Sequence, residues 1–142
     1  NRTISCNHWL FNIKIKDNPN CAACQVDDNL THFFIECKQV KQIWISFSRW
    51  WQSICGISLT LTNTNILFGF NNVTSINNCI NYLLIQAKKF IHDSKLNESF
   101  VISFYTFLHY IKNQLIVEKA ICENNGQLQS FEGIFGIVFN NL

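Results

Sequence analysis

The sequence contains no methionine, a single proline and only 14% charged residues, against about 25% in an average globular protein. Hydrophobic residues make up 48% of the chain, which excludes an intrinsically disordered protein as the default interpretation. A chain with so little charge is expected to cover part of its apolar surface with another protein. Together with the missing initiator methionine, this predicts a piece of a larger protein.

Long apolar runs are also missing. No run reaches the roughly 18 residues that span a bilayer, and no signal-peptide pattern opens the chain. We therefore expect no membrane partner and an intracellular location, in the nucleus and/or the cytoplasm. The odd number of cysteines, seven, fits a reducing compartment. The net charge of +2 is too small to identify a nucleic-acid-binding protein by itself.

Catalytic motifs are absent as well. The sequence holds no Gly-rich phosphate loop, nucleophile elbow or His-Glu-x-x-His helix. Its one Asp-Asp pair, Asp27-Asp28, lacks the preceding aromatic residue and the hairpin of a polymerase metal site. His8, His92 and His109 are isolated on apolar or mixed stretches. We predict that this chain is not an enzyme and binds no small-molecule substrate.

What the sequence does contain is a set of four metal-ligand side chains, Cys21, Cys24, His32 and Cys37, at C-x2-C-x7-H-x4-C spacing. A CxxC turn directs two thiolates at one ion, and the following His and Cys complete a tetrahedron around Zn²⁺. Four protein ligands leave no open position, so the zinc is expected to be structural. Two other interpretations are ordinary buried side chains and a redox CxxC pair, although no βαβ unit surrounds the motif.

Periodicity predicts a mainly α fold: a small CCHC zinc knuckle with a short strand, joined to a bundle of about four helices. Alternation from Phe11 to Lys16 predicts the strand, and Pro19 a turn. A short helix around His32 could be capped by Asp28, Asn29 or Thr31. A helix over residues 38–55 should end at Gly56, with its aromatic stripe in the core. That stripe comprises Val40, Ile43, Trp44, Phe47, Trp50, Trp51 and Ile54.

Two long helices are predicted in the second half, over residues 75–95 and 99–124. The buried face of the second should include Val101, Phe104, Tyr105, Leu108, Ile111 and Leu115. The tail, residues 126–142, fits neither a helix nor a strand clearly. The chain therefore divides into residues 1–56 (entry strand, knuckle and aromatic helix), residues 57–74 (connection) and residues 75–142 (helical carboxyl-terminal region).

The knuckle sequence, with Pro19 before the first Cys, Phe33-Phe34 after the His and Trp44 a short helix later, resembles the reverse-transcriptase zinc-binding domain of LINE-type (non-LTR) retrotransposon proteins. The match covers residues 9–51 well and extends loosely to about residue 125. It departs from the family where Leu30-Thr31 replaces an acidic residue before the His. The resemblance implies a non-catalytic region of an RNA-directed DNA polymerase that assists binding of template RNA or target DNA.

Two hypotheses follow for the function. In the first, cations near the knuckle contact the phosphates of RNA or DNA. Those cations are Lys14, Lys16, Lys38, Lys41 and Arg49. In the second, zinc fixes a structural domain that docks on the rest of the parent polymerase or on another subunit. Buried tryptophans with scattered lysines would favour the second hypothesis, and exposed rings beside converging lysines the first. A third hypothesis, a copy that folds but has lost its partner, is disfavoured by the intact ligand set.

Overall fold

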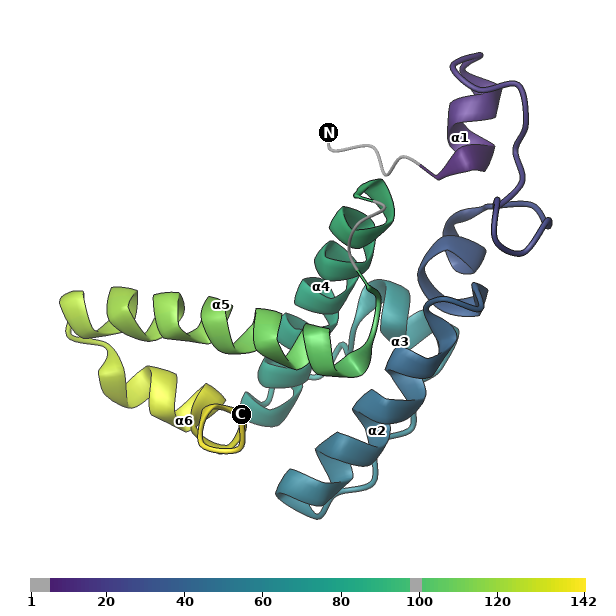
Figure 1. Ribbon diagram of the computed structural model, residues 1–142. Helices are drawn as coiled ribbons and strands as arrows, with labels where there is room; N and C mark the ends of the chain where they lie inside the picture. Colours follow the sequence, from purple (N-terminus) through teal and green to yellow (C-terminus); the bar gives the residue numbers. More distant parts are fainter. Residues whose placement is uncertain (1–5, 98–100) are drawn as a thin grey trace.

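The computed structural model describes residues 6–97 and 101–142, and these residues are mainly helical (Figure 1). The elements are α1 (Asn7–Asn12), a π-helical turn η1 (His32–Glu36), α2 (Lys41–Cys55), α3 (Asn63–Phe68), α4 (Ser75–Leu96), α5 (Phe104–Asn124) and α6 (Leu128–Phe139). The mainly α prediction is confirmed. Within the described ranges there is no β-strand, and one isolated antiparallel bridge joins Asn20 to Asp27.

The predicted strand over residues 11–16 is therefore wrong. The chain forms α1 and then turns back on it: the N–H groups of Ile15 and Lys16 both donate to the carbonyl of Leu10, at 2.9 and 3.3 Å. Lys14 has the left-handed φ of 60° that this reversal needs. The alternating pattern did not produce a strand for two reasons. Ile13 and Ile15 are exposed, so the alternation does not mark a buried face, and no neighbouring strand in the described structure pairs the backbone groups.

Helix α2 follows the aromatic stripe of the sequence. Ile43, Trp44, Phe47 and Trp51 are buried, which confirms that the stripe belongs to the core. The helix ends at Gly56, whose φ of 71° is favourable for glycine. It begins three residues later than predicted because residues 38–40 form a turn against the cysteines, in which the N–H of Lys38 donates to Cys24 Sγ.

Helix α4 matches its prediction to within one residue, and Thr74 caps it by accepting a hydrogen bond from the N–H of Asn77. Helix α5 begins at Phe104 with a capping box formed by Ser103 and Thr106. Residues 99 and 100 of the predicted helix lie outside the described residues.

The buried face of α5 differs from the predicted one. Phe107, Ile111 and Leu115 are fully buried, whereas Val101 and Tyr105 are about 70% exposed. The predicted stripe was wrong at Val101, which precedes the helix, and at Tyr105, which lies six positions before Ile111 and so faces another direction. Phe107 lies four positions before Ile111 and shares its buried face.

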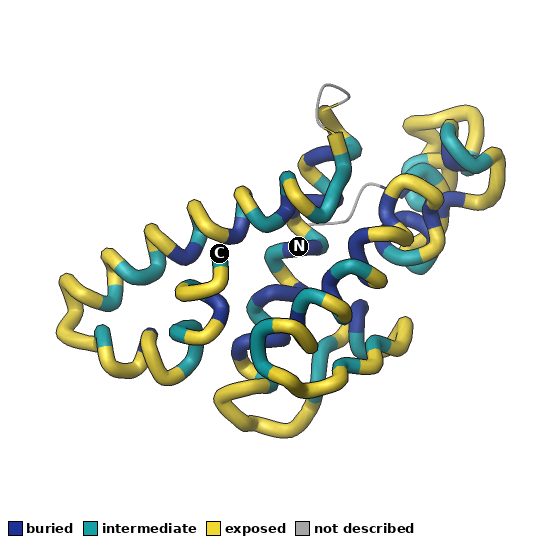
Figure 2. Tube along the Cα trace, turned by 60° about the horizontal axis from the view of Figure 1, so that its bottom comes forward, coloured by how far each residue is buried: buried dark blue, intermediate teal, exposed yellow. Residues whose placement is uncertain are grey.

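The four longest helices pack on one another. Helix α5 contacts α2, α4 and α6, and α6 also contacts α2 and α4. Figure 1 shows α5 and α6 as an antiparallel hairpin beside α4. Buried residues line the inward faces of these helices in Figure 2, and Phe131 and Val138 anchor α6. The tail that the sequence left unplaced is thus part of the core.

The connection over residues 57–74 holds α3, and Ile66 of that helix is buried. Asn81 of α4 fixes the end of the connection, because its side chain bonds both the N–H and the carbonyl of Phe70, at 2.7 and 2.9 Å. Gly69, at a φ of 83°, leaves room for it: a Cβ there would lie 2.7 Å from Asn81 Oδ1. Among the described helices, none combines the length and apolarity needed to cross a bilayer.

Candidate metal centre

The structure brings together the four side chains that the spacing singled out. The ligand atoms of Cys21, Cys24, His32 and Cys37 all lie within 4.8 Å of one another. Cys37 Sγ is 3.9 Å from both Cys21 Sγ and Cys24 Sγ, too far for a disulfide bond of about 2.05 Å, and all three are free cysteines. The group can therefore bind a metal ion.

The CxxC segment forms a tight knuckle. The carbonyl of Cys21 accepts from the N–H of Gln25 at 2.8 Å, and the carbonyl of Val26 accepts from the N–H of Cys21 at 2.8 Å. Gln25 adopts a φ of 60°, a left-handed conformation that closes the loop. These bonds turn the chain around the two cysteines, so that both thiols face the same point.

The π-helical turn brings His32 and Cys37 together. In an α-helix, positions five apart lie about 140° apart around the axis, at about 100° per residue. In η1 the N–H of Cys37 instead donates to the carbonyl of His32 at 2.9 Å, an i to i+5 bond that stacks the two ligands at one side. Of the three predicted caps, Asn29 accepts a hydrogen bond from the N–H of His32 at 3.0 Å through its side chain, whereas Thr31 forms no side-chain cap bond.

The centre is mostly closed to solvent. Cys37 is 0% exposed, His32 4% and Cys21 7%, while Cys24 is half-buried at the edge. The backbone N–H of Lys38 lowers the pKa of Cys24, whereas burial raises the pKa of Cys37. Nε2 of His32 is buried and has no hydrogen-bond partner in the described structure. A buried unpaired nitrogen is unfavourable, and a metal ion would satisfy it.

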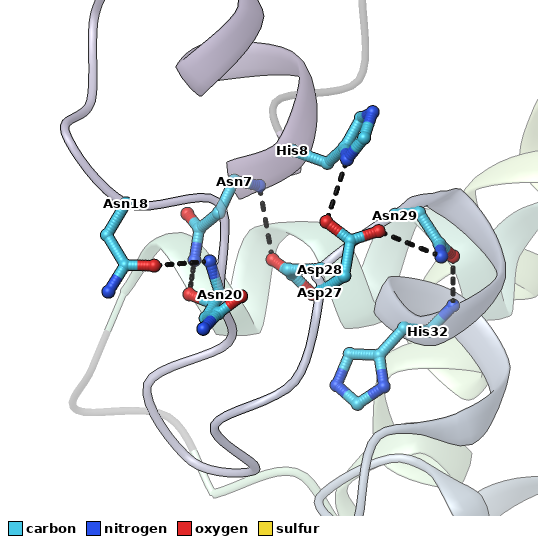
Figure 3. Close-up of polar contacts among 8 residues, drawn as sticks. All are labelled: Asn7, His8, Asn18, Asn20, Asp27, Asp28, Asn29 and His32. Atoms are coloured by element: carbon cyan, nitrogen blue, oxygen red, sulfur yellow. Dashed lines mark hydrogen bonds and ion pairs between the residues drawn. The ribbon is translucent and has the colours of Figure 1, made fainter.

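Polar contacts attach α1 to the loop over residues 18–31, which carries Cys21 and Cys24 and is called the metal loop below, as Figure 3 shows. The buried Asp28 satisfies the first two N–H groups of α1, although it is distant in the sequence. Its Oδ2 accepts from the N–H of Asn7 at 3.2 Å, and its carbonyl accepts from the N–H of His8 at 3.3 Å. His8 Nδ1 lies 2.7 Å from Asp27 Oδ1. The side chain of Asn7 donates to the carbonyl of Asn20 at 2.8 Å.

Two contacts attach the centre to the helices beyond it. The indole N–H of Trp44 donates to the carbonyl of Phe34 at 2.7 Å. Lys95, at the end of α4, donates to the carbonyl of Phe33 at 2.7 Å. The sequence places Trp44 correctly in the core but does not reveal this bond, nor does it identify Lys95 or the capping role of Asp28 for α1. No local sequence pattern marks such contacts, because their partners are distant along the chain.

The five cations of the nucleic-acid hypothesis are all exposed, and in the described parts of the chain none forms an ion pair with a carboxylate. Lys14 and Lys16 follow α1 at one end of the molecule, whereas Arg49 lies midway along α2, which runs away from that end (Figure 1). Lys16 bonds Asn7 Oδ1 at 2.7 Å. Lys38 directly follows the ligand Cys37 and Lys41 begins α2, so only part of the set lies beside the metal ligands.

Comparison of the chain with protein-family models, with curated proteins and with solved structures gives no significant match. The resemblance to the reverse-transcriptase zinc-binding domain therefore stays a prediction from the residues of the knuckle and from Trp44.

Proposed function

We propose that Cys21, Cys24, His32 and Cys37 bind one Zn²⁺ in a closed, structural site. Two thiolates bound tetrahedrally to Zn²⁺ at about 2.3 Å each lie about 3.8 Å apart, close to the two Sγ–Sγ distances of 3.9 Å. The convergence of these ligand atoms is the observation that carries the proposal. Three sulfurs and one nitrogen favour zinc over magnesium or calcium, which prefer oxygen ligands.

On the resemblance, we propose further that the chain is a non-catalytic zinc-binding region of a retrotransposon reverse transcriptase and works inside the cell. The four closed ligands support a non-catalytic role for the metal, because a catalytic zinc keeps a position for water or substrate. The metal then orders the loop around Asp28 and catalyses no reaction.

Docking on the parent polymerase or another subunit is the role that the tryptophans favour. Trp44 and Trp51 are buried and Trp9 and Trp50 half-buried, so their rings are not presented for stacking on bases. Apolar side chains are exposed elsewhere, and a groove of about 230 Å³ lies between the metal loop, α3 and α4. That volume falls below the about 300–1,000 Å³ of small-molecule sites and suits one or two side chains of a protein partner. The groove is lined by Leu30, Phe34, Leu67, Phe68, Ile85 and Lys88.

Binding of template RNA or target DNA is the second candidate, and the exposure of the five cations favours it. Each phosphate that such a cation neutralises releases counterions, so the affinity should fall steeply with salt. This role is compatible with the same zinc site, since the metal fixes the segment that carries Lys38 and precedes Lys41.

The test combines zinc analysis of the purified chain with binding of labelled single-stranded RNA and duplex DNA over a salt series. We expect one zinc per chain. If nucleic acid binds through the proposed cations, the K38Q/K41Q variant should lower the logarithmic salt slope for single strands by about 0.7 for each phosphate that it no longer neutralises. The matched variant K89Q/K112Q, with the same charge change on α4 and α5, should leave the slope unchanged.

The outcomes separate the candidates. One zinc with salt-sensitive binding that K38Q/K41Q weakens supports the nucleic-acid role. One zinc without binding, or with equal weakening in both variants, leaves docking as the function. A chain that purifies and folds without zinc contradicts the proposal as a whole.

A further inference from the structure

Lys95 lies in the last turn of α4, yet its ammonium group reaches the metal-binding turn. Its Nζ donates to the carbonyl of Phe33 at 2.7 Å, and the two residues are 62 positions apart in the sequence. The same Nζ lies 4.2 Å from the centroid of the Phe33 ring, a cation–π contact. One ammonium group therefore holds both the backbone and the side chain of the residue that follows the ligand His32.

Phe33 is held firmly enough to transmit this contact. The residue is 4% exposed, and its ring packs edge-on against Phe34 at 4.9 Å and near His92 of α4 at 6.2 Å. The η1 turn that begins at His32 and leads to Cys37 is thus seated on the end of α4. Moving this turn would move two of the four ligands.

The charge of Lys95 also complements the centre. Three thiolates and a neutral imidazole around Zn²⁺ carry a net charge of −1, and a buried charge is costly without compensation. The Lys95 ammonium group, 2.7 Å from the carbonyl of Phe33, places its positive charge beside the turn that carries His32. In the described structure Lys95 forms no ion pair with a carboxylate that would cancel its charge.

We propose that Lys95 is a positioning residue of the metal centre, which fixes the His32–Glu36 turn and neutralises the charge of the thiolate-bound metal. Metal affinity then depends on a residue of α4, far along the chain from every ligand. This inference rests on the proposed zinc site. By linkage, bound metal also stabilises the end of α4 against the turn, so that the metal-binding segment and the carboxyl-terminal helices are coupled.

The experiment measures zinc affinity of the full chain by competition with a chelator, and follows Co²⁺ substitution by its thiolate charge-transfer and ligand-field absorption. The variants are K95M, which removes charge and donor, K95Q, which keeps an N–H donor without charge, and K95R, which keeps both. K89M and K89Q are the matched controls, because Lys89 is an exposed lysine on the same helix.

We expect K95M to bind zinc at least about tenfold more weakly than K89M, in the range of outer ligand-shell substitutions. K95Q should show an intermediate weakening, and K95R should restore most of the affinity. The Co²⁺ spectrum of K95M should shift, whereas a merely structural role would lower stability and leave the spectrum of the loaded, folded protein unchanged.

Two results would overturn the inference separately from the zinc site. If the unmodified chain binds one zinc and K95M matches K89M in affinity and spectrum, the positioning role is wrong while the proposed function stands. If K95M does not fold, K95Q against K89Q decides, because its amide can keep the bond to Phe33; equal affinities would contradict the inference. An unmodified chain that binds no zinc removes the proposed function and this inference together.

Discussion

Helix α1 buries none of its residues, whereas α4 buries eight, among them Leu83, Leu84 and Ile91. In the segment over residues 6–31, hydrogen bonds from Asn7 to Asp28 and Asn20 join α1 to the loop of the first two candidate ligands, and much of the surface is exposed. Individual hydrogen bonds contribute only about 0.5–1.5 kcal/mol each. Among residues 6–31 only Cys6, Cys21 and Asp28 are buried, so this segment has little apolar core of its own. We therefore expect bound metal to contribute for residues 6–31 what burial contributes for the helices.

Removing a metal ligand should unfold the segment around α1 and leave the helices around α4 folded. We expect Cys37→Ala to lose the metal and to unfold residues 6–31, while α4, α5 and α6 keep their helical structure. Structural zinc contributes an apparent free energy of about 10–16 kcal/mol in zinc-finger peptides, so this effect is the largest. Zinc analysis and amide hydrogen exchange measure it, with Cys122→Ala as the control. Slow exchange preserved over residues 20–31 would refute this difference between the regions.

The reverse experiment damages the helical core. Phe47 is fully buried and packs near Trp44 and Phe107, with ring centroids 6.4 Å away in both cases. Phe47→Ala should lower the free energy of unfolding by about 3–5 kcal/mol, because it leaves a cavity. Urea denaturation measures the change, and Ile45→Ala, at an exposed position of the same helix, should change stability far less. A similar decrease in both variants would mean that the aromatic stripe does not form the core.

The bond from Trp44 to Phe34 joins the two regions and should show an intermediate effect. Trp44→Phe keeps an aromatic ring but leaves the buried carbonyl of Phe34 without its donor. We expect a decrease of about 1–3 kcal/mol in unfolding free energy, together with weaker zinc binding, since the η1 turn is held less firmly. Trp50→Phe is the control, because Trp50 is only half-buried. Lower stability without any change in zinc affinity would show that the regions are not coupled through this bond.

The smallest predicted effect lies inside the knuckle. Gln25 has a left-handed φ of 60°, which costs a non-glycine residue about 1–2 kcal/mol relative to glycine. Gln25→Gly should stabilise the metal-loaded protein by about 0.5–1 kcal/mol, since removal of the side-chain bond to the Ala22 carbonyl offsets part of the gain. Thermal unfolding measures it. Gln39→Gly, outside this loop, should not stabilise, and neutral or destabilising behaviour of Gln25→Gly would argue against strain in the loop.

Long periodic segments were predictable from the sequence. The apolar spacing around Phe47 and the glycine at position 56 predicted α2, and the pattern around Leu83 predicted α4, because burial of one helix face dominates their energetics. Short segments were not: the alternation at Ile13 and Ile15 suggested a strand that has no partner. Helix α6 was not predicted, because its glycines interrupt the apolar pattern and its buried face is defined by contacts with α2, α4 and α5.

By itself, the sequence determined the mainly helical fold, the aromatic core of α2 and the identity of the four candidate ligands, because these follow from local periodicity and from the chemistry of Cys and His. Only the tertiary structure decided that η1 is a π-turn that aligns His32 with Cys37, that Asp28 caps α1, and that Lys95 reaches Phe33 from the end of α4. Those features are contacts between groups that are distant in the sequence. Their free energy depends on the packing of the whole fold, so no single stretch of the chain predicts them.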